Sequence, residues 1–119
     1  LKNIKKIRKQ RAFIEFRKKL DKIDLKKISS EELSKKLYEI IYNLFIDRWN
    51  INIKQMGINE IVYFLKQNGF NSNLAEEVGK IIEEIESFKY FAGSNELFDQ
   101  LIDKVKDKFL NLEKGIENI

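Results

Sequence analysis

The sequence of 119 residues contains no cysteine, no histidine and no proline. Without cysteine the chain cannot form a disulfide or a thiolate nucleophile, and without histidine it lacks a common zinc ligand and the base of a serine–histidine triad. Its longest uninterrupted apolar run, Ile61 to Leu65, is five residues long, whereas a transmembrane helix needs about 20. These absences exclude a disulfide scaffold, a zinc cluster and a membrane span within this sequence.

What the chain has in abundance is charge, and the two signs are unevenly distributed. Residues 1–27 contain twelve Lys or Arg and three acidic residues, a net charge of +9, whereas residues 28–119 contain eleven basic and sixteen acidic residues, a net charge of −5. A basic arm therefore precedes an acidic body, and we expect the two to have different roles. Because the chain opens with Leu1 and not with Met, we also expect it to be a piece of a longer protein.

Apolar residues recur at helical spacing along the whole chain, and no stretch alternates as a strand does. The first apolar seam is formed by Phe13, Phe16, Leu20 and Ile23, and the last runs from Phe98 to Leu112. We therefore predict an all-α fold, a compact bundle of four to five helices with a basic N-terminal helical arm. Residues 1–27 would form the juxtamembrane-like arm and first helix, and residues 28–119 the acidic bundle, within a single domain overall.

Polar residues and glycine mark the expected ends of the helices. Ser29 and Glu32 have the spacing of a capping box, which predicts the start of a helix that ends near Trp49. Asn68-Gly69 predicts a helix stop, because glycine accepts the left-handed conformation found there. Further N-caps are expected at Asn59, Ser72 and Ser94.

Two patterns that could bind DNA or a metal are disfavoured by their charges. The helices on either side of Asn68-Gly69 have the outline of a helix-turn-helix, but the second one is rich in glutamate and would repel phosphates. The carboxylates of residues 76–84 and 99–107 lack the histidine of a di-iron site and alternate with lysine, which is typical of a solvated face. No nucleotide-binding or calcium-binding motif occurs. We therefore expect no enzyme activity, no cofactor and no metal site.

The basic arm is the strongest local signal for a function. Its candidate contacts to a membrane surface or to phosphates are Lys5, Lys6, Arg8, Lys9 and Arg11. Such a cluster fits the anionic inner leaflet, as in the segment just inside a transmembrane helix, and it also fits nucleic acid. The third alternative is a charged helical face that only keeps the chain in solution. No aromatic residue precedes Phe13, which argues against a platform for stacking single-stranded bases.

The aromatic residues outnumber what a narrow core stripe buries. A groove for a partner helix is one interpretation, and burial in the core is the other. The candidates for the groove are Tyr38, Tyr42, Trp49, Tyr90 and Phe91.

The order of these elements resembles the cytoplasmic C-terminal region of BatD-type proteins, the bacterial aerotolerance or oxygen-tolerance group. The resemblance covers roughly residues 5 to 113 and depends on the order and spacing of elements. It is carried by the segments KKIRKQRAF at 5–13, LYEIIYNLFI at 37–46, IVYFLKQNGF at 61–70, EEIESFKYFAG at 83–93 and the last amphipathic helix at 97–112. One departure is Ala92, where the family often has proline.

The resemblance implies a role and no catalytic residue. Proteins of this family are similar to single-span membrane proteins with extracytoplasmic β-rich domains and a helical tail inside the cell, encoded beside von Willebrand A-domain proteins and a MoxR-type AAA+ ATPase. It thus implies an interaction domain at the cytoplasmic face of the inner membrane that docks those partner proteins. The alternative is a small basic-armed, nucleic-acid-associated helical protein that uses its arm to bind phosphates.

Overall fold

The computed structural model describes residues 2–91 and 93–117, so Leu1, Ala92, Asn118 and Ile119 lie outside the described part. The described residues form α-helices and short 3-10 turns and no strand, which confirms the predicted all-α class. The helices are α1 (Lys2–Asp21), α2 (Ser30–Trp49), α3 (Ile58–Gln67), α4 (Ser72–Phe88) and α5 (Asn95–Glu117). The 3-10 turns are η1 (Leu25–Lys27) and η2 (Ile53–Gln55).

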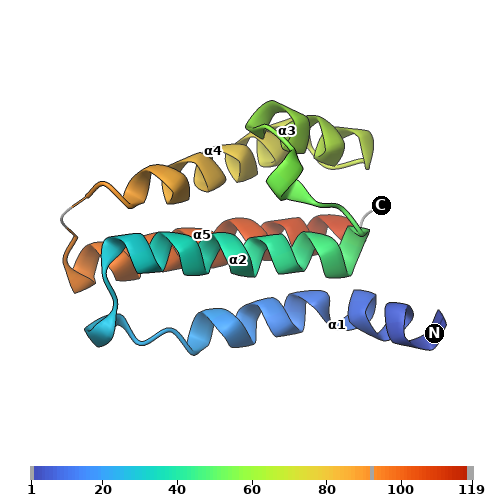
Figure 1. The fold of residues 1–119 in the computed structure, drawn as a ribbon. Helices are drawn as coiled ribbons and strands as arrows, with labels where there is room; N and C mark the ends of the chain where they lie inside the picture. Colours follow the sequence, from blue (N-terminus) through green and yellow to red (C-terminus); the bar gives the residue numbers. More distant parts are fainter. Residues whose placement is uncertain (1, 92, 118–119) are drawn as a thin grey trace.

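Four of the helices form an antiparallel bundle (Figure 1). Around the bundle α1 packs against α2, α2 against α4, α4 against α5, and α5 against α1. Each helix runs opposite to both of its neighbours, the up-down-up-down arrangement that short connections favour. The fifth helix, α3, lies outside this square and packs against α4. The bundle measures 41 × 30 × 25 Å along its principal axes.

One hydrophobic core joins all five helices. The predicted seams of the first and last helices face this core, and the rings of Phe16 on α1 and Phe109 on α5 meet at 4.9 Å between centroids. The first helix ends at Asp21, before Ile23, which is half-buried in the connection that follows. The α1 seam therefore closes the bundle, while the helix itself begins well upstream of the core.

The helix ends are partly as predicted. Ser29 is the N-cap of α2, its hydroxyl accepting from the backbone N–H of Glu32 at 3.2 Å, and α2 ends at Trp49. Gly69, with φ 89°, follows the end of α3 in the left-handed region. Ser94 precedes α5, and its hydroxyl accepts from the backbone N–H of Leu97 at 3.4 Å.

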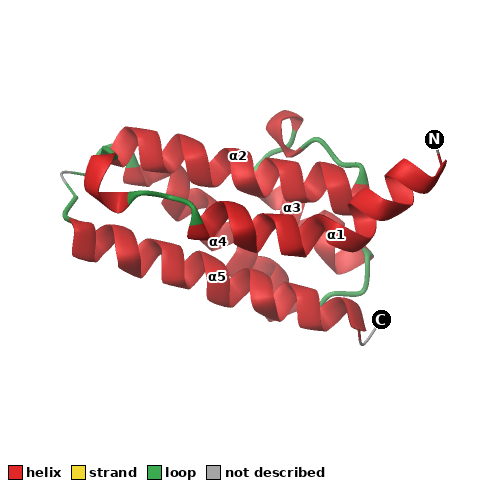
Figure 2. Cartoon of the chain, turned by 90° about the horizontal axis from the view of Figure 1, so that it is seen from below, coloured by secondary structure: helices red, strands yellow, loops and turns green. Residues whose placement is uncertain are grey.

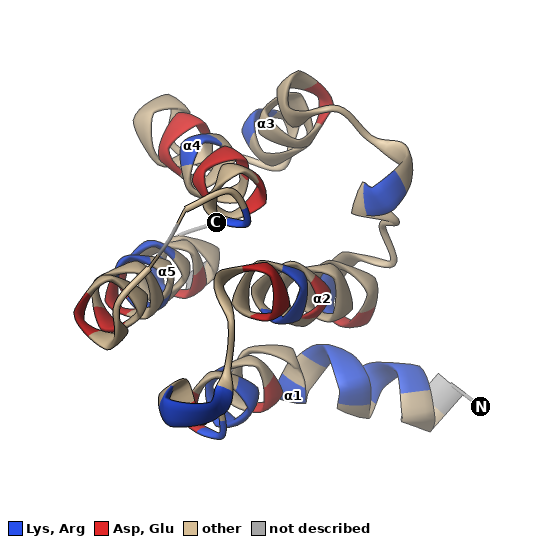
Figure 3. Ribbon diagram, turned by 60° about the vertical axis from the view of Figure 1, so that its left-hand side comes forward, with Lys and Arg blue, Asp and Glu red and all other residues tan. Residues whose placement is uncertain are grey.

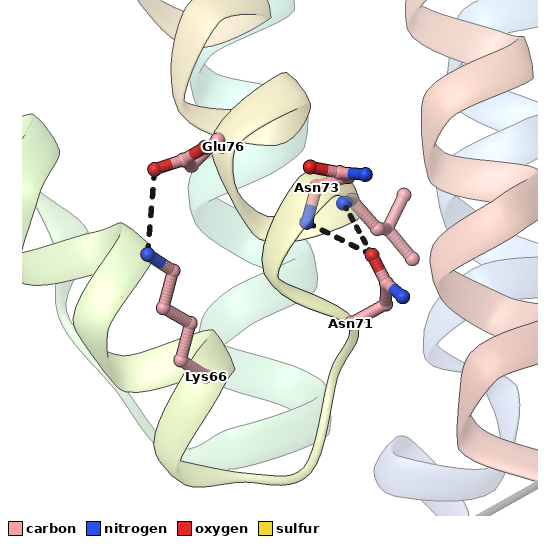
Figure 4. A network of polar contacts seen from close by, with 5 residues as sticks. Lys66, Asn71, Asn73 and Glu76 are labelled. Atoms are coloured by element: carbon pink, nitrogen blue, oxygen red, sulfur yellow. Dashed lines mark hydrogen bonds and ion pairs between the residues drawn. The ribbon is translucent and has the colours of Figure 1, made fainter.

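Two of the predicted N-caps were wrong by one or two residues. The N-cap of α3 is Gly57 and not Asn59, because the carboxylate of Glu60 accepts from the Gly57 N–H at 3.1 Å and fixes the first turn two residues earlier. The N-cap of α4 is Asn71 and not Ser72, because the Asn71 amide oxygen accepts from the backbone N–H groups of positions 73 and 74 at 2.8 and 3.4 Å. Figure 4 shows this cap.

The α3–α4 pair is held together by close packing as well as by this turn. A Cβ on Gly79 would lie 2.6 Å from a methyl of Val62, so the two helices approach at a position where no side chain fits. Beside it, the Lys66 ammonium on α3 lies 3.4 Å from the Glu76 carboxylate on α4 (Figure 4). The pair is a hairpin that contributes to the core through both helices.

Candidate functional site

The predicted cationic residues lie on the first turns of α1, beyond the part of the helix that enters the core. Residues 3–11 are all exposed, and burial begins at Ala12 and Phe13. Figure 2 shows these turns extending past the rest of the bundle, and Figure 3 shows the basic residues that cover them. The structure thus places Lys5, Lys6, Arg8, Lys9 and Arg11 on one exposed helical segment, which we call the cationic arm.

Most of the charge on the cationic arm is uncompensated. Arg11 is the exception, since its guanidinium donates to the Glu15 carboxylate at 3.0 Å, and this hydrogen bond lowers the pKa of Glu15. Four residues of the arm make no ion pair within the described ranges 2–91 and 93–117, namely Lys5, Lys6, Arg8 and Lys9.

The lysines of α5 differ from those of the arm, because they face acidic neighbours. Lys104 lies 3.1 Å from Glu84, and Lys108 lies 2.8 Å from Glu77 on the neighbouring helix α4. The hydrogen bond from Lys108 to Glu77 raises the pKa of that ammonium group. These two lysines of the acidic body are therefore paired, whereas the charge of Lys5, Lys6, Arg8 and Lys9 on the arm is directed at solvent.

Arg48, near the end of α2, extends the cationic arm, although the run of basic residues in the sequence does not predict it. A hollow of about 370 Å³ lies between the arm and the end of α2, lined by Lys5, Arg8 and Lys9 from α1 and by Asp47, Arg48 and neighbouring residues of α2. A second hollow, of about 440 Å³, is lined by Lys6, Lys9 and Arg48 together with residues of α5. Arg48 and Lys9 thus contribute to both.

The position of Arg48 follows from the antiparallel arrangement of α1 and α2. The ring of Trp49 meets Phe13 at 6.2 Å between centroids, which brings the end of α2 to the level of the arm. The helical hairpin predicts this position of Arg48, because two antiparallel helices joined by a short connection place the end of the second helix beside the start of the first. Charge counting along the chain misses it because Arg48 lies far from the arm in sequence.

The cationic arm with Arg48 can bind anions but offers no reaction chemistry of its own. Salt screens exposed charges, so binding of anions by these side chains should weaken as the ionic strength rises. Cations close to an anionic leaflet contribute about 1 kcal/mol each, and the same side chains would neutralise nucleic-acid phosphates.

The five aromatic residues predicted for a partner groove lie in three different places. Trp49 is partly buried and packs against the core, with ring contacts to Phe45 at 4.9 Å and to Phe64 and Phe70 at 6.0 Å between centroids. Tyr90 and Phe91 lie just after the end of α4, with 81% and 58% of their surface exposed.

Tyr38 and Tyr42 are the remaining pair, and they lie against η2. The Tyr38 hydroxyl donates to the Ile53 carbonyl at 3.4 Å, and the Lys54 ammonium lies 4.2 Å from the centre of the Tyr42 ring. Partial burial raises the pKa of Tyr38.

No single groove can contain all five aromatic residues. The backbone N–H of Gly93 donates to the Ser30 hydroxyl at 3.3 Å, which places the α4–α5 connection at the start of α2. Trp49 is at the other end of the same helix, about 28 Å away at 1.5 Å per residue. Tyr90 and Phe91, at the end of the bundle opposite the cationic arm, are the most exposed of the five, whereas Tyr38 and Tyr42 are half-buried.

The carboxylates of the body do not converge on a common point. Three of those discussed above pair with lysines, and within the described residues no group of three or more carboxylates could hold a metal ion. In the same described part, no helix combines the length and the apolar character that crossing a bilayer requires. Comparison of the chain with protein-family models, curated proteins and solved structures gives no match.

Proposed function

We propose that this chain is a non-enzymatic interaction domain whose cationic arm holds it at the anionic cytoplasmic face of a bacterial membrane while its acidic bundle docks partner proteins. The observation that carries the proposal is the unpaired charge of Lys5, Lys6, Arg8 and Lys9 on an exposed helix that extends past the core. The proposal agrees with what the resemblance to the BatD-type aerotolerance tail implies.

The concentration of like charges on the arm has an electrostatic cost that an anionic membrane surface would offset. A protein that only needs solubility can intersperse both signs of charge, as this chain does on α4 and α5. The arm instead concentrates one sign, and Arg48 adds to it from another helix. Like charges held together on a stable helix repel one another unless an anionic partner neutralises them. At about 1 kcal/mol per cation near the leaflet, the four unpaired arm residues would supply roughly 4 kcal/mol at low salt.

We assign the docking of protein partners to the end of the molecule opposite the cationic arm. Tyr90 and Phe91 are exposed there, beside the acidic helices α4 and α5 (Figure 3). Large exposed aromatic residues are typical anchors of protein interfaces. Because the two ends are separated by the length of the bundle, whose longest dimension is 41 Å, a partner could bind there while the arm remains at the membrane. The partners that the resemblance implies are von Willebrand A-domain Bat proteins and a MoxR-type ATPase.

A nucleic-acid-associated protein is the second candidate, because the same unpaired cations would also neutralise phosphates. Co-sedimentation with vesicles, with duplex DNA as competitor and over a salt series, separates the two. We expect binding to vesicles with an anionic lipid, none to neutral vesicles, and persistence of vesicle binding in the presence of DNA. Tight binding to DNA with a steep salt dependence, and displacement from vesicles by DNA, would favour the second candidate instead.

A further inference from the structure

Helix α1 has apolar residues on two opposite faces, and the fold uses only one of them. The inner face holds Phe13, Phe16 and Leu20, all buried in the core. The outer face holds Ile4, Ile7 and Ile14, which are 54%, 53% and 40% exposed.

Helical geometry places the three isoleucines together. At about 100° per residue, Ile4 and Ile7 are about 60° apart around the helix axis and Ile7 and Ile14 about 20° apart, whereas Phe16 lies about 180° from Ile7. The helix is continuous from Lys2 to Asp21, so these relations hold along its whole length. The three side chains therefore form one outward stripe, which we call the isoleucine stripe.

We propose that the isoleucine stripe inserts into the acyl boundary of an anionic bilayer, so that α1 lies parallel to the membrane surface. This inference rests on the proposed function and adds to it an apolar contact and an orientation. An in-plane helix of this kind combines an apolar stripe with lysine and arginine beside it. Here Arg8 flanks the stripe, and Arg11 and Lys18, which pair with Glu15 at 3.0 and 3.9 Å, interrupt it. The long stems of these cations let the charged groups reach the headgroups while the isoleucines insert.

The charges also distinguish a bilayer from a second copy of the chain. A second copy packed on the stripe would take Arg11, Lys18 and their partner Glu15 out of water, whereas at a bilayer surface these charges stay hydrated. Neither of the two hollows beside Lys9 is lined by a residue of the isoleucine stripe. A helical face that combines exposed isoleucines with lysine and arginine suits an anionic bilayer surface.

The absence of cysteine makes the test direct, because a single introduced cysteine is a unique label. The Ile7→Cys variant, labelled with an environment-sensitive fluorophore, should show a blue shift on vesicles that contain phosphatidylserine. The control label at the exposed position of Asn73→Cys on α4 should show none. If the label on position 7 kept its aqueous spectrum while the protein was bound, the inference would be overturned.

A variant without the stripe tests the energetic contribution. Ile4, Ile7 and Ile14 replaced together by serine should weaken partitioning into anionic vesicles about 100-fold, since burying half of each side chain contributes roughly a factor of five. The helical spectrum should be retained because none of the three is in the core. Unchanged partitioning would overturn the inference and leave a purely electrostatic contact, whereas loss of a dimer in solution in this variant would assign the stripe to a second copy. If the unaltered chain failed to bind anionic vesicles even at low salt, the proposed function itself would fail.

Discussion

Ser34 is a buried polar side chain that links α2 to the last turn of α4, and its removal tests how the bundle is held together. Its hydroxyl donates to the carbonyl of Ile85 at 2.7 Å, and both residues are buried. Carbonyls in the last turn of a helix lack the usual partner four residues on. Here the N–H of Tyr90 bonds to the Ser87 carbonyl at 3.2 Å, and Ser34 supplies a side-chain donor to the buried Ile85 carbonyl.

The Ser34→Ala variant should therefore lower the free energy of unfolding. Leaving a buried carbonyl without a partner costs about 1–3 kcal/mol. Alanine recovers about 0.5 kcal/mol of that through its higher helix propensity. We expect a net loss of about 0.5–2.5 kcal/mol, or a fall in Tm of about 2–10 °C for a domain of this size.

Urea unfolding followed by circular dichroism at 222 nm measures this loss. The matched control is Ser87→Ala, since the Ser87 hydroxyl is exposed and bonds to the Glu84 carbonyl at 3.0 Å within α4. That variant should stay within about 0.5 kcal/mol of the unaltered chain, as surface substitutions usually do. Equal stability of the two variants would refute the reasoning that Ser34 satisfies a buried carbonyl.

Three further substitutions test a helix contact, a helix cap and the pH dependence of stability. Gly79→Val should destabilise the bundle by about 1–3 kcal/mol, because its side chain would clash with α3. The control Glu83→Val, on the exposed face of the same helix, should have a small effect. Similar losses of stability in the two variants would contradict the close packing of α3 and α4. Asn71→Ala should cost about 1 kcal/mol in thermal unfolding and Asn73→Ala markedly less, because the cap belongs to position 71. Burial raises the pKa of Tyr38 in the folded state, so the unfolded chain loses that proton first and the free energy of unfolding falls as the pH rises above about 10. The Tyr38→Phe variant should lose less stability at alkaline pH than the unaltered chain. An identical dependence of stability on pH in the two proteins would contradict this.

The fold could be predicted largely because each helix carries its own apolar seam and its own terminal signals. The capping box at Ser29 and the glycine at position 69 act through nearby backbone groups, so their effect can be predicted from a few residues. The caps of α3 and α4 were missed by one or two residues because several neighbouring polar residues compete there. The hydrogen bond from the Gly57 N–H to the Glu60 carboxylate makes Gly57 the N-cap of α3. Which side chain reaches which N–H depends on the folded geometry and not on the residue types alone.

The candidate site could be predicted only where it is local in sequence. The cationic arm is a run of neighbouring residues, so counting charges finds it. Arg48 joins the arm through the pairing of α1 and α2, and the pairing of Arg11 with Glu15 removes one arm cation from the unpaired set. The aromatic set divides because burial is a property of the packed bundle, which puts Trp49 inside and leaves Tyr90 exposed.

The central claim is that the position of the charge on the arm, and not the net charge of the chain, holds the domain at an anionic surface. It is tested most directly by a pair of variants that remove the same total charge from different places. The arm variant replaces Lys5, Lys6, Arg8 and Lys9 by glutamine. The control variant makes the same change at four exposed lysines elsewhere, namely Lys22, Lys27, Lys36 and Lys80.

The measurement is the bound fraction on phosphatidylserine-containing vesicles at low salt. At about 1 kcal/mol per cation, the arm variant should lose about 100- to 1,000-fold in partitioning, and the control variant should lose less than about tenfold. Equal losses in the two variants would show that only net charge matters and would contradict the proposed role of the arm.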